Sequence, residues 1–125
     1  MRAGRTEAIT VPSVPASVAS VRRYVVGVCQ AAGLEELSDV AALLVSEVAT
    51  NALVHGSGDV RVQAVVTALL LRVEVSDDDP GLPSPRQARE LDEGGRGLAL
   101  LDALAQRWGT DARVDGKTVW FELSA

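Results

Sequence analysis

Residues 40–55 read VAALLVSEVATNALVH, a run in which nearly every position is valine, leucine or alanine. A helix that is apolar around almost its whole circumference is expected to be buried on most sides. The sequence GSG at residues 56–58 is a strong signal for the end of a helix. The run therefore predicts a central, largely buried helix over residues 35–55, against which the other elements must pack.

Three polar residues follow one face of this helix. Glu47, Asn51 and His55 are spaced four residues apart, which places them one above another on the helix surface. A carboxylate or an amide in apolar surroundings costs free energy, on the order of several kcal/mol for an unpaired charge, unless it finds a partner. We therefore expect something polar to lie against this face.

Two interpretations of these polar residues remain open on the sequence alone. In the first, Glu47 and Asn51 bond to the backbone of a neighbouring loop or lie on a solvated strip. In the second, Asn51 supplies an oxygen ligand to Mg²⁺, which is commonly held by one or two protein oxygens plus substrate phosphates. Glu47 would then accept a proton from an attacking hydroxyl group or water. His55 fits best as the last residue of the helix, where a partly charged imidazole suits the helix dipole.

Two turns further along the chain carry chemistry of their own. DDDPG at residues 77–81 follows a strand-like segment, and an aspartate there either forms an Asx turn or accepts a hydrogen bond from an exocyclic amine such as adenine N6. GGRGL at residues 94–98 precedes a helical pattern. Glycine amides and a helix N-terminus can together bind phosphate, and Arg96 either adds donors or is solvated.

The remaining pattern predicts an α+β fold with a single domain over residues 1–125. Its order of strands and helices implies a two-layer α/β sandwich, with three main helices on one face of a mixed, largely antiparallel sheet. Residues 1–4 look like a loose end, and Gly33 suits a left-handed helix C-cap. The expected elements are a strand at 5–11, a helix at 16–32, strands at 60–66 and 69–75 joined near 67–68, a loop at 77–96, a helix at 97–107 and strands at 109–114 and 118–123.

Composition narrows the class of protein. The chain has 125 residues, of which 47% are hydrophobic, and a net charge of −5. The longest basic cluster is the pair Arg22-Arg23, so nucleic acid is not an expected partner. Cys29 is the sole cysteine, which excludes an internal disulfide and predicts a core position. We identify no signal sequence and no membrane-length apolar run, and therefore expect a cytoplasmic protein without a membrane partner.

Three segments together resemble motifs of the GHKL superfamily, which includes gyrase, a heat-shock chaperone, histidine kinases and mismatch-repair ATPases. EVATNALVHG at residues 47–56 resembles the N box of that group. DDDPG at residues 77–81 resembles the G1 box, D-x-G-x-G, and GRGL at residues 95–98 resembles the G2 box. The resemblance spans nearly the whole chain. It implies the Bergerat ATP-binding fold, which agrees with the order of elements above.

The resemblance also implies ATP and Mg²⁺ as cofactors. Asn51 would ligate the Mg²⁺ that bridges the ATP phosphates, and Glu47 would be the general base that activates a serine hydroxyl of a protein substrate. Asp77 would accept a hydrogen bond from adenine. The other nucleotide-binding residues implied by the two glycine motifs are Gly81, Gly95, Arg96, Gly97 and Leu98.

The short length and the sequence from Gly95 to Gly109 look most like the stand-alone anti-sigma factor serine kinases of bacterial partner-switching systems. Such a protein phosphorylates an anti-anti-sigma antagonist, sequesters a sigma factor and is often a homodimer. One departure is Asp79, which stands where the G1 box has its first glycine, close to the charge of Asp77. The alternative is therefore a module that retains the fold, has weakened catalysis and regulates a partner by protein contact alone.

Overall fold

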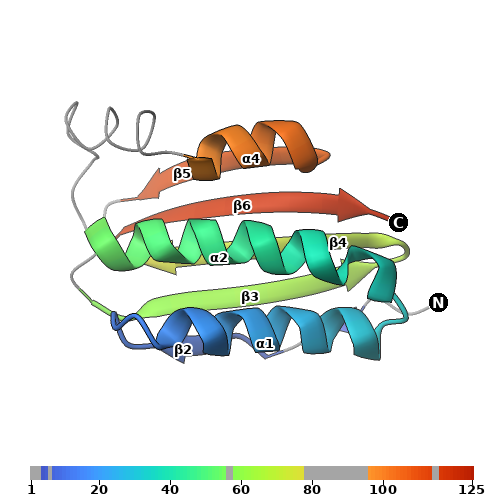
Figure 1. Ribbon diagram of the computed structural model, residues 1–125, viewed down its shortest axis with the longest axis horizontal. Helices are drawn as coiled ribbons and strands as arrows, with labels where there is room; N and C mark the ends of the chain where they lie inside the picture. The colour runs from blue at the N-terminus through green and yellow to red at the C-terminus, as the bar shows by residue number, and fades with distance from the viewer. Residues whose placement is uncertain (1–3, 6, 56–57, 78–95, 114–115) are drawn as a thin grey trace.

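The computed structural model describes residues 4–5, 7–55, 58–77, 96–113 and 116–125 (Figure 1). Strands and helices account for most of these residues. In chain order they are β1 Gly4–Arg5, β2 Ile9–Val11, α1 Ser17–Ala31, the short 3-10 helix η1 Glu35–Leu37, α2 Ser38–His55, β3 Val60–Thr67, β4 Leu70–Asp77, α4 Arg96–Leu104, β5 Arg107–Arg113 and β6 Gly116–Ser124.

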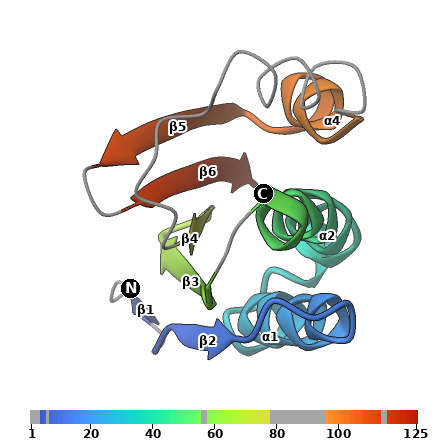
Figure 2. The same cartoon turned by 90° about the vertical axis from the view of Figure 1, so that its left-hand side faces the viewer.

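The strands form one sheet in the order β1-β3-β4-β6-β5, and β2 also pairs with β3. Every pairing in the described part of the chain is antiparallel. Helices α1, α2 and α4 cover one face of the sheet, and no helix among the described residues lies over the other face (Figure 2). This arrangement confirms the predicted α+β sandwich with three helices on one face.

Helix α1 is amphipathic, and its C-terminus is closed by a glycine. Gly33 has φ +74°, a conformation that costs other residues strain. The N–H of Leu34 donates to the carbonyl of Cys29 at 2.8 Å, and the N–H of Gly33 donates to the carbonyl of Gln30 at 3.2 Å. This pair of bonds is a Schellman motif, and the Leu34 side chain that follows it is buried. The prediction of a left-handed cap at Gly33 is confirmed.

Helix α2 lies between α1 and α4, with one side on the sheet (Figure 1). The span Glu35–Val54 is long and apolar enough to cross a membrane, so the prediction that no segment has this property is wrong. In this fold, many of its apolar side chains belong to the core of the domain. The stripe that contacts the sheet is fully or almost fully buried, and consists of Ala41, Leu44, Val45, Val48, Ala49 and Ala52.

The sheet face under the helices is built by strict alternation of buried and less buried side chains along β3 and β4. Both strands therefore match the predicted period of two. They are joined by a two-residue connection after Thr67, in which Ala68 has φ 54°. Glycine or asparagine is the usual choice for a positive φ, and its absence left the position of this turn uncertain in the sequence.

The opening strand differs from its prediction because it is broken in two. The gap between β1 and β2 is one residue longer than the gap that it faces on β3, so the pairing is interrupted by a bulge. There the backbone N–H of Ala64 donates to the hydroxyl of Tyr24 on α1, at 2.9 Å. The Tyr24 hydroxyl thus contacts the backbone of β3 beside the break between β1 and β2.

Several predicted boundaries need correction. The helix predicted over residues 35–55 is divided, because residues 35–37 form η1 and α2 begins at Ser38. Asp77, the first residue of the predicted loop, is the last residue of β4, and β6 begins at Gly116 instead of residue 118. Gly4 pairs with Val66 as part of β1, so the loose end expected over residues 1–4 is wrong at Gly4. Helix α4 ends at Leu104, three residues before the predicted end, because Arg107 already pairs with Glu122 as the first residue of β5.

Candidate functional site

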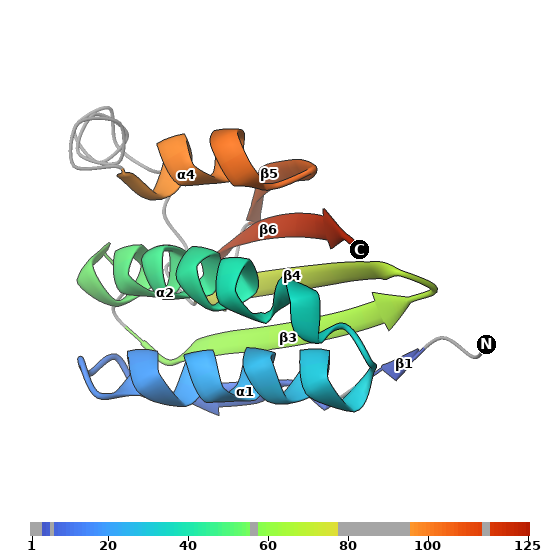
Figure 3. The same ribbon diagram turned by 45° about the vertical axis from the view of Figure 1, so that its right-hand side comes forward.

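One end of the molecule gathers the ends of four elements. The last turn of α2, the end of β4, the beginning of α4 and the beginning of β6 all lie there (Figures 1 and 3). Helices α2 and α4 run side by side in opposite directions, so successive turns of α2 towards its C-terminus meet earlier turns of α4. The described parts of the predicted boxes, namely the end of α2, Asp77 and the first turn of α4, therefore lie at the same end of the fold.

Glu47 lines an open groove between α2 and α4. The groove has a volume of about 460 Å³ and is lined by Leu43 and Glu47 from α2 and by Ala99, Leu100 and Ala103 from α4. The two alanines leave room between the helices, and Glu47 is the only charged side chain among these lining residues. The half-buried Glu47 thus faces a space that a ligand or a protein segment can enter.

Asn51 lies one turn beyond Glu47 on the same helix and is also half-buried. Because α4 runs antiparallel to α2, this turn lies nearer the beginning of α4 (Figure 3). His55 is the last residue of α2, as predicted, but its side chain lies outside the described residues. The side-chain oxygens of Glu47 and Asn51 are of the type that Mg²⁺ prefers.

The G2 segment does open a helix. Arg96, Gly97 and Leu98 form the first turn of α4, although their side chains lie outside the described residues. The unpaired N–H groups of such a first turn suit a phosphate group. Gly81, Gly95 and Asp79 lie outside the described residues, so their predicted roles are untested.

Two contacts between helix α4 and the rest of the domain help to position it. Leu101 is completely buried among the core side chains. The indole N–H of Trp108, on β5, donates to Asp102 Oδ1 at 2.8 Å. These two contacts position the helix whose first turn carries the G2 segment.

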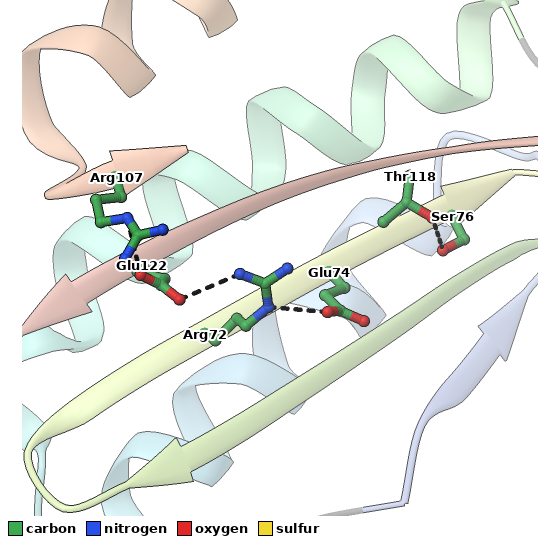
Figure 4. A network of polar contacts seen from close by, with 6 residues as sticks. All are labelled: Arg72, Glu74, Ser76, Arg107, Thr118 and Glu122. Carbon is green, nitrogen blue, oxygen red and sulfur yellow. Dashed lines mark hydrogen bonds and ion pairs between the residues drawn. The ribbon is translucent and has the colours of Figure 1, made fainter. Parts of the chain in front are cut away.

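Asp77 is the last residue of β4 and is only 3% exposed. It pairs in register with Lys117 at the beginning of β6, and the Lys117 ammonium lies 3.7 Å from Asp77 Oδ2. On the opposite face of the sheet, the neighbouring hydroxyl groups of Ser76 and Thr118 hydrogen-bond to each other at 2.8 Å (Figure 4). The buried carboxylate is thus on the helix side of the sheet, with a cation beside it.

The open face of the sheet carries a polar network that the sequence did not indicate. Arg72 contacts Glu74 at 2.9 Å and Glu122 at 3.1 Å, and Arg107 lies 3.7 Å from the second oxygen of Glu122 (Figure 4). The guanidinium of Arg72 also lies over the ring of Trp120, 4.2 Å from its centre. These residues are far from Glu47 in the fold, because they point away from the helices.

Comparison with known proteins adds the family. The model of the histidine kinase-like ATPase domain matches residues 11–123, almost the whole chain. The chain belongs to that family. The histidine kinase-like ATPase domain is an ATP-binding regulatory domain, and its match covers all three segments singled out in the sequence. The match includes α2, and the domain buries one stripe of this apolar helix, whereas Leu43 and Val54 are exposed.

One curated relative is an uncharacterized protein of Streptomyces coelicolor. The two chains are 54% identical over 50 residues, which is 38% of this chain and 48% of the relative. The chain thus matches about half the length of that protein.

Sequence reasoning predicted roles for Glu47, Asn51 and Asp77 from their residue types and spacing, but it did not point to Lys117, which contacts Asp77. Lys117 lies 40 residues after Asp77 in the chain and becomes its neighbour only through the register of β4 and β6. The one available signal was composition, since Lys117 is the single lysine among 12 basic residues.

Proposed function

We propose that this ATP-binding domain is a protein serine kinase that also acts as an anti-sigma factor. The observation that carries the proposal is the position of Glu47, which lines an open groove between α2 and α4. A carboxylate is a suitable general base only if the substrate hydroxyl can reach it. The groove gives a segment of a second protein such access.

Each residue of the proposed site has a separate role. Asn51 and the first turn of α4 hold the nucleotide, with Asn51 as the Mg²⁺ ligand and the α4 amides on phosphate oxygens. Asp77 accepts a hydrogen bond from the base. When bound, Mg²⁺-ATP would supply the phosphoryl group, with ADP as the leaving group, and the cation would offset the negative charge of the phosphates. Glu47 accepts the proton of the substrate serine hydroxyl, so that the oxygen becomes the nucleophile.

The proposed protein substrate is an anti-anti-sigma antagonist, and the proposed target of sequestration is a sigma factor. Both assignments are supported by the resemblance of the glycine-rich segment and of the following helix to the stand-alone kinases. The cytoplasm is the compartment in which both partners would be met. A homodimer belongs to the same proposal.

Incubation with Mg²⁺-ATP and antagonist proteins from the same genome tests the kinase. We expect phosphoserine on one antagonist and a loss of at least about 100-fold in rate for Glu47→Gln, since general-base catalysis contributes roughly that much or more. Asp39→Asn, which removes an exposed carboxylate from the first turn of the same helix, is the matched control. Transfer at the normal rate by the Glu47→Gln variant would remove Glu47 from the mechanism.

The second candidate is a regulatory module that no longer phosphorylates. The specific observation in its favour is Asp79, which replaces a glycine of the G1 box. Titration calorimetry at millimolar nucleotide separates the two candidates. Absence of heat with the natural chain, and its appearance in Asp79→Gly, would favour the module.

A further inference from the structure

The Asp77–Lys117 pair is the most buried ion pair that the structure describes. The side chains are 2% and 14% exposed, whereas each of the other ion pairs has at least one partner that is more than 30% exposed. Two charges are removed from water only at a substantial cost, which a single ion pair does not always offset. A lysine at this position therefore calls for an explanation beyond stability.

The Asp77–Lys117 pair places a hydrogen-bond acceptor and a hydrogen-bond donor side by side. A carboxylate only accepts hydrogen bonds, with capacity for about four, and a lysine ammonium only donates, with three N–H groups. The contact between Lys117 and Asp77 Oδ2 therefore places a group that only donates beside a group that only accepts. The lysine head is carried by a flexible stem, so it can turn its donors towards a ligand beside Asp77.

The edge of a purine base is complementary to such a pair in either of two ways. Adenine offers the N6 amine as a donor and N1 as an acceptor. Guanine and hypoxanthine offer the opposite order, with O6 as an acceptor and N1–H as a donor. A carboxylate alone fits the adenine amine but would repel O6. A carboxylate with an ammonium group beside it has a partner for either arrangement.

We propose that Lys117 extends base recognition at this site from adenine to 6-oxopurine nucleotides, so that the domain binds GTP as well as ATP. The inference rests on the proposed function, because it takes Asp77 as the residue that meets the base. Asp77 accepts from the amine of adenine, or from N1–H and the N2 amine of guanine. Lys117 donates to N1 of adenine, or to O6 of guanine. Lys117 is thus a specificity-determining residue.

A purely structural ion pair makes a different prediction. If Lys117 only supported the strand pairing of β4 and β6, its removal would weaken the binding of all nucleotides by the same factor. The ratio of ATP affinity to GTP affinity is therefore the informative quantity. It does not change with overall stability or with phosphate and Mg²⁺ contacts, which all the nucleotides share.

Titration calorimetry with the Mg²⁺ salts of ATP, GTP and inosine triphosphate tests the proposal on the full chain. We expect the natural protein to bind GTP within about tenfold of ATP. Lys117→Met removes one donor from either base, but only the 6-oxopurines then place an oxygen, O6, beside the carboxylate of Asp77 without a cation. The preference for ATP over GTP and over inosine triphosphate should therefore rise by about tenfold or more. Lys117→Arg keeps a cationic donor and should retain the natural ratio.

Arg61→Met is the matched control, because it removes an exposed positive charge from the opposite face of the same sheet. It should leave all three affinities unchanged. Thermal unfolding verifies that each variant is folded. If Lys117→Met does not fold, Lys117→Thr removes the ammonium with a residue that suits a strand.

The outcomes distinguish the two levels of the argument. A natural protein that binds ATP but shows no GTP binding overturns the role of Lys117 and leaves the proposed function intact. An unchanged ATP-to-GTP ratio in Lys117→Met and Lys117→Thr does the same. A natural protein that binds none of the three nucleotides overturns both.

Discussion

The indole ring of Trp120 lies against the α-carbon of Gly109, its partner across β6 and β5. A Cβ atom at Gly109 would come within 2.8 Å of Trp120 Cζ2, closer than real side chains pack. The absence of a side chain at Gly109 thus lets Trp120 lie flat on the open face of the sheet. There the ring also meets the guanidinium of Arg72.

Gly109→Ala is therefore expected to destabilise the domain. The added methyl group must displace the indole, and overpacking of this kind costs about 1–3 kcal/mol of unfolding free energy. Urea unfolding measures the change. In a Trp120→Leu background the obstacle is gone, so the same substitution should be nearly neutral. Equal losses in both backgrounds would show that the ring is not the cause.

Two glycines of the first helix segment should respond to alanine in opposite directions. Gly33 has φ +74°, and alanine there should cost about 1 kcal/mol because the left-handed conformation crowds its Cβ. Gly27 is exposed within α1, and a Cβ there meets nothing within 4 Å. Gly27→Ala should stabilise by about 0.5–1 kcal/mol. If the two substitutions shift the melting temperature in the same direction, the left-handed cap at Gly33 is contradicted.

Tyr24→Phe removes only the hydroxyl that accepts the N–H of Ala64. The loss of a typical intramolecular hydrogen bond costs about 0.5–1.5 kcal/mol of unfolding free energy. Hydrogen exchange is the sharper measurement, because the amide of Ala64 should lose protection more than the amides of Val62 or Val66. Uniform loss of protection along β3 would indicate a general effect on packing instead.

Helix α4 should depend on the bond between Asp102 and Trp108. Asp102→Ala removes the hydrogen bond that connects α4 to Trp108 on β5. We expect ATP affinity to fall by about threefold to tenfold, since a typical hydrogen bond contributes about 0.5–1.5 kcal/mol. Asp102→Asn retains the acceptor oxygen and should bind ATP almost normally. If both variants bind equally weakly, the charge of Asp102 matters and not its hydrogen bond.

Cys29 gives a pH dependence with a definite sign. Burial raises the pKa of this thiol above its ordinary value of 9.0, although the Ser38 hydroxyl opposes the shift. The unfolded chain therefore loses the proton first, and the free energy of unfolding falls as pH rises above about 9, by at most about 1.4 kcal/mol per pH unit. Comparison with Cys29→Ala between about pH 8 and about pH 10 isolates this contribution, which is absent below pH 9.

The parts of the fold that were predictable depend on local sequence. Local patterns predicted three features of the fold. These are the apolar run of α2, the alternation in β3 and β4, and the glycine at position 33. The break between β1 and β2 was not predictable, because it depends on the register against β3 and on a hydroxyl from α1.

The same limit applies to the site. Glu47 and Asn51 are four residues apart, so helix geometry alone places them on one face. Lys117 reaches Asp77 only through the pairing of β4 with β6, two strands that are far apart in the sequence. Chemistry held within one element could be inferred from the sequence, and chemistry shared between strands could not.

The position of β6 has a consequence for the order of assembly during synthesis. It follows β4 and β5 in the chain but lies between them in the sheet. Until residues 116–124 leave the ribosome, β5 has no neighbour to join, and the side of α2 that rests on the sheet stays partly uncovered. A nascent chain that stalls before this point would expose the apolar surface of α2 to chaperones, proteases or lipid.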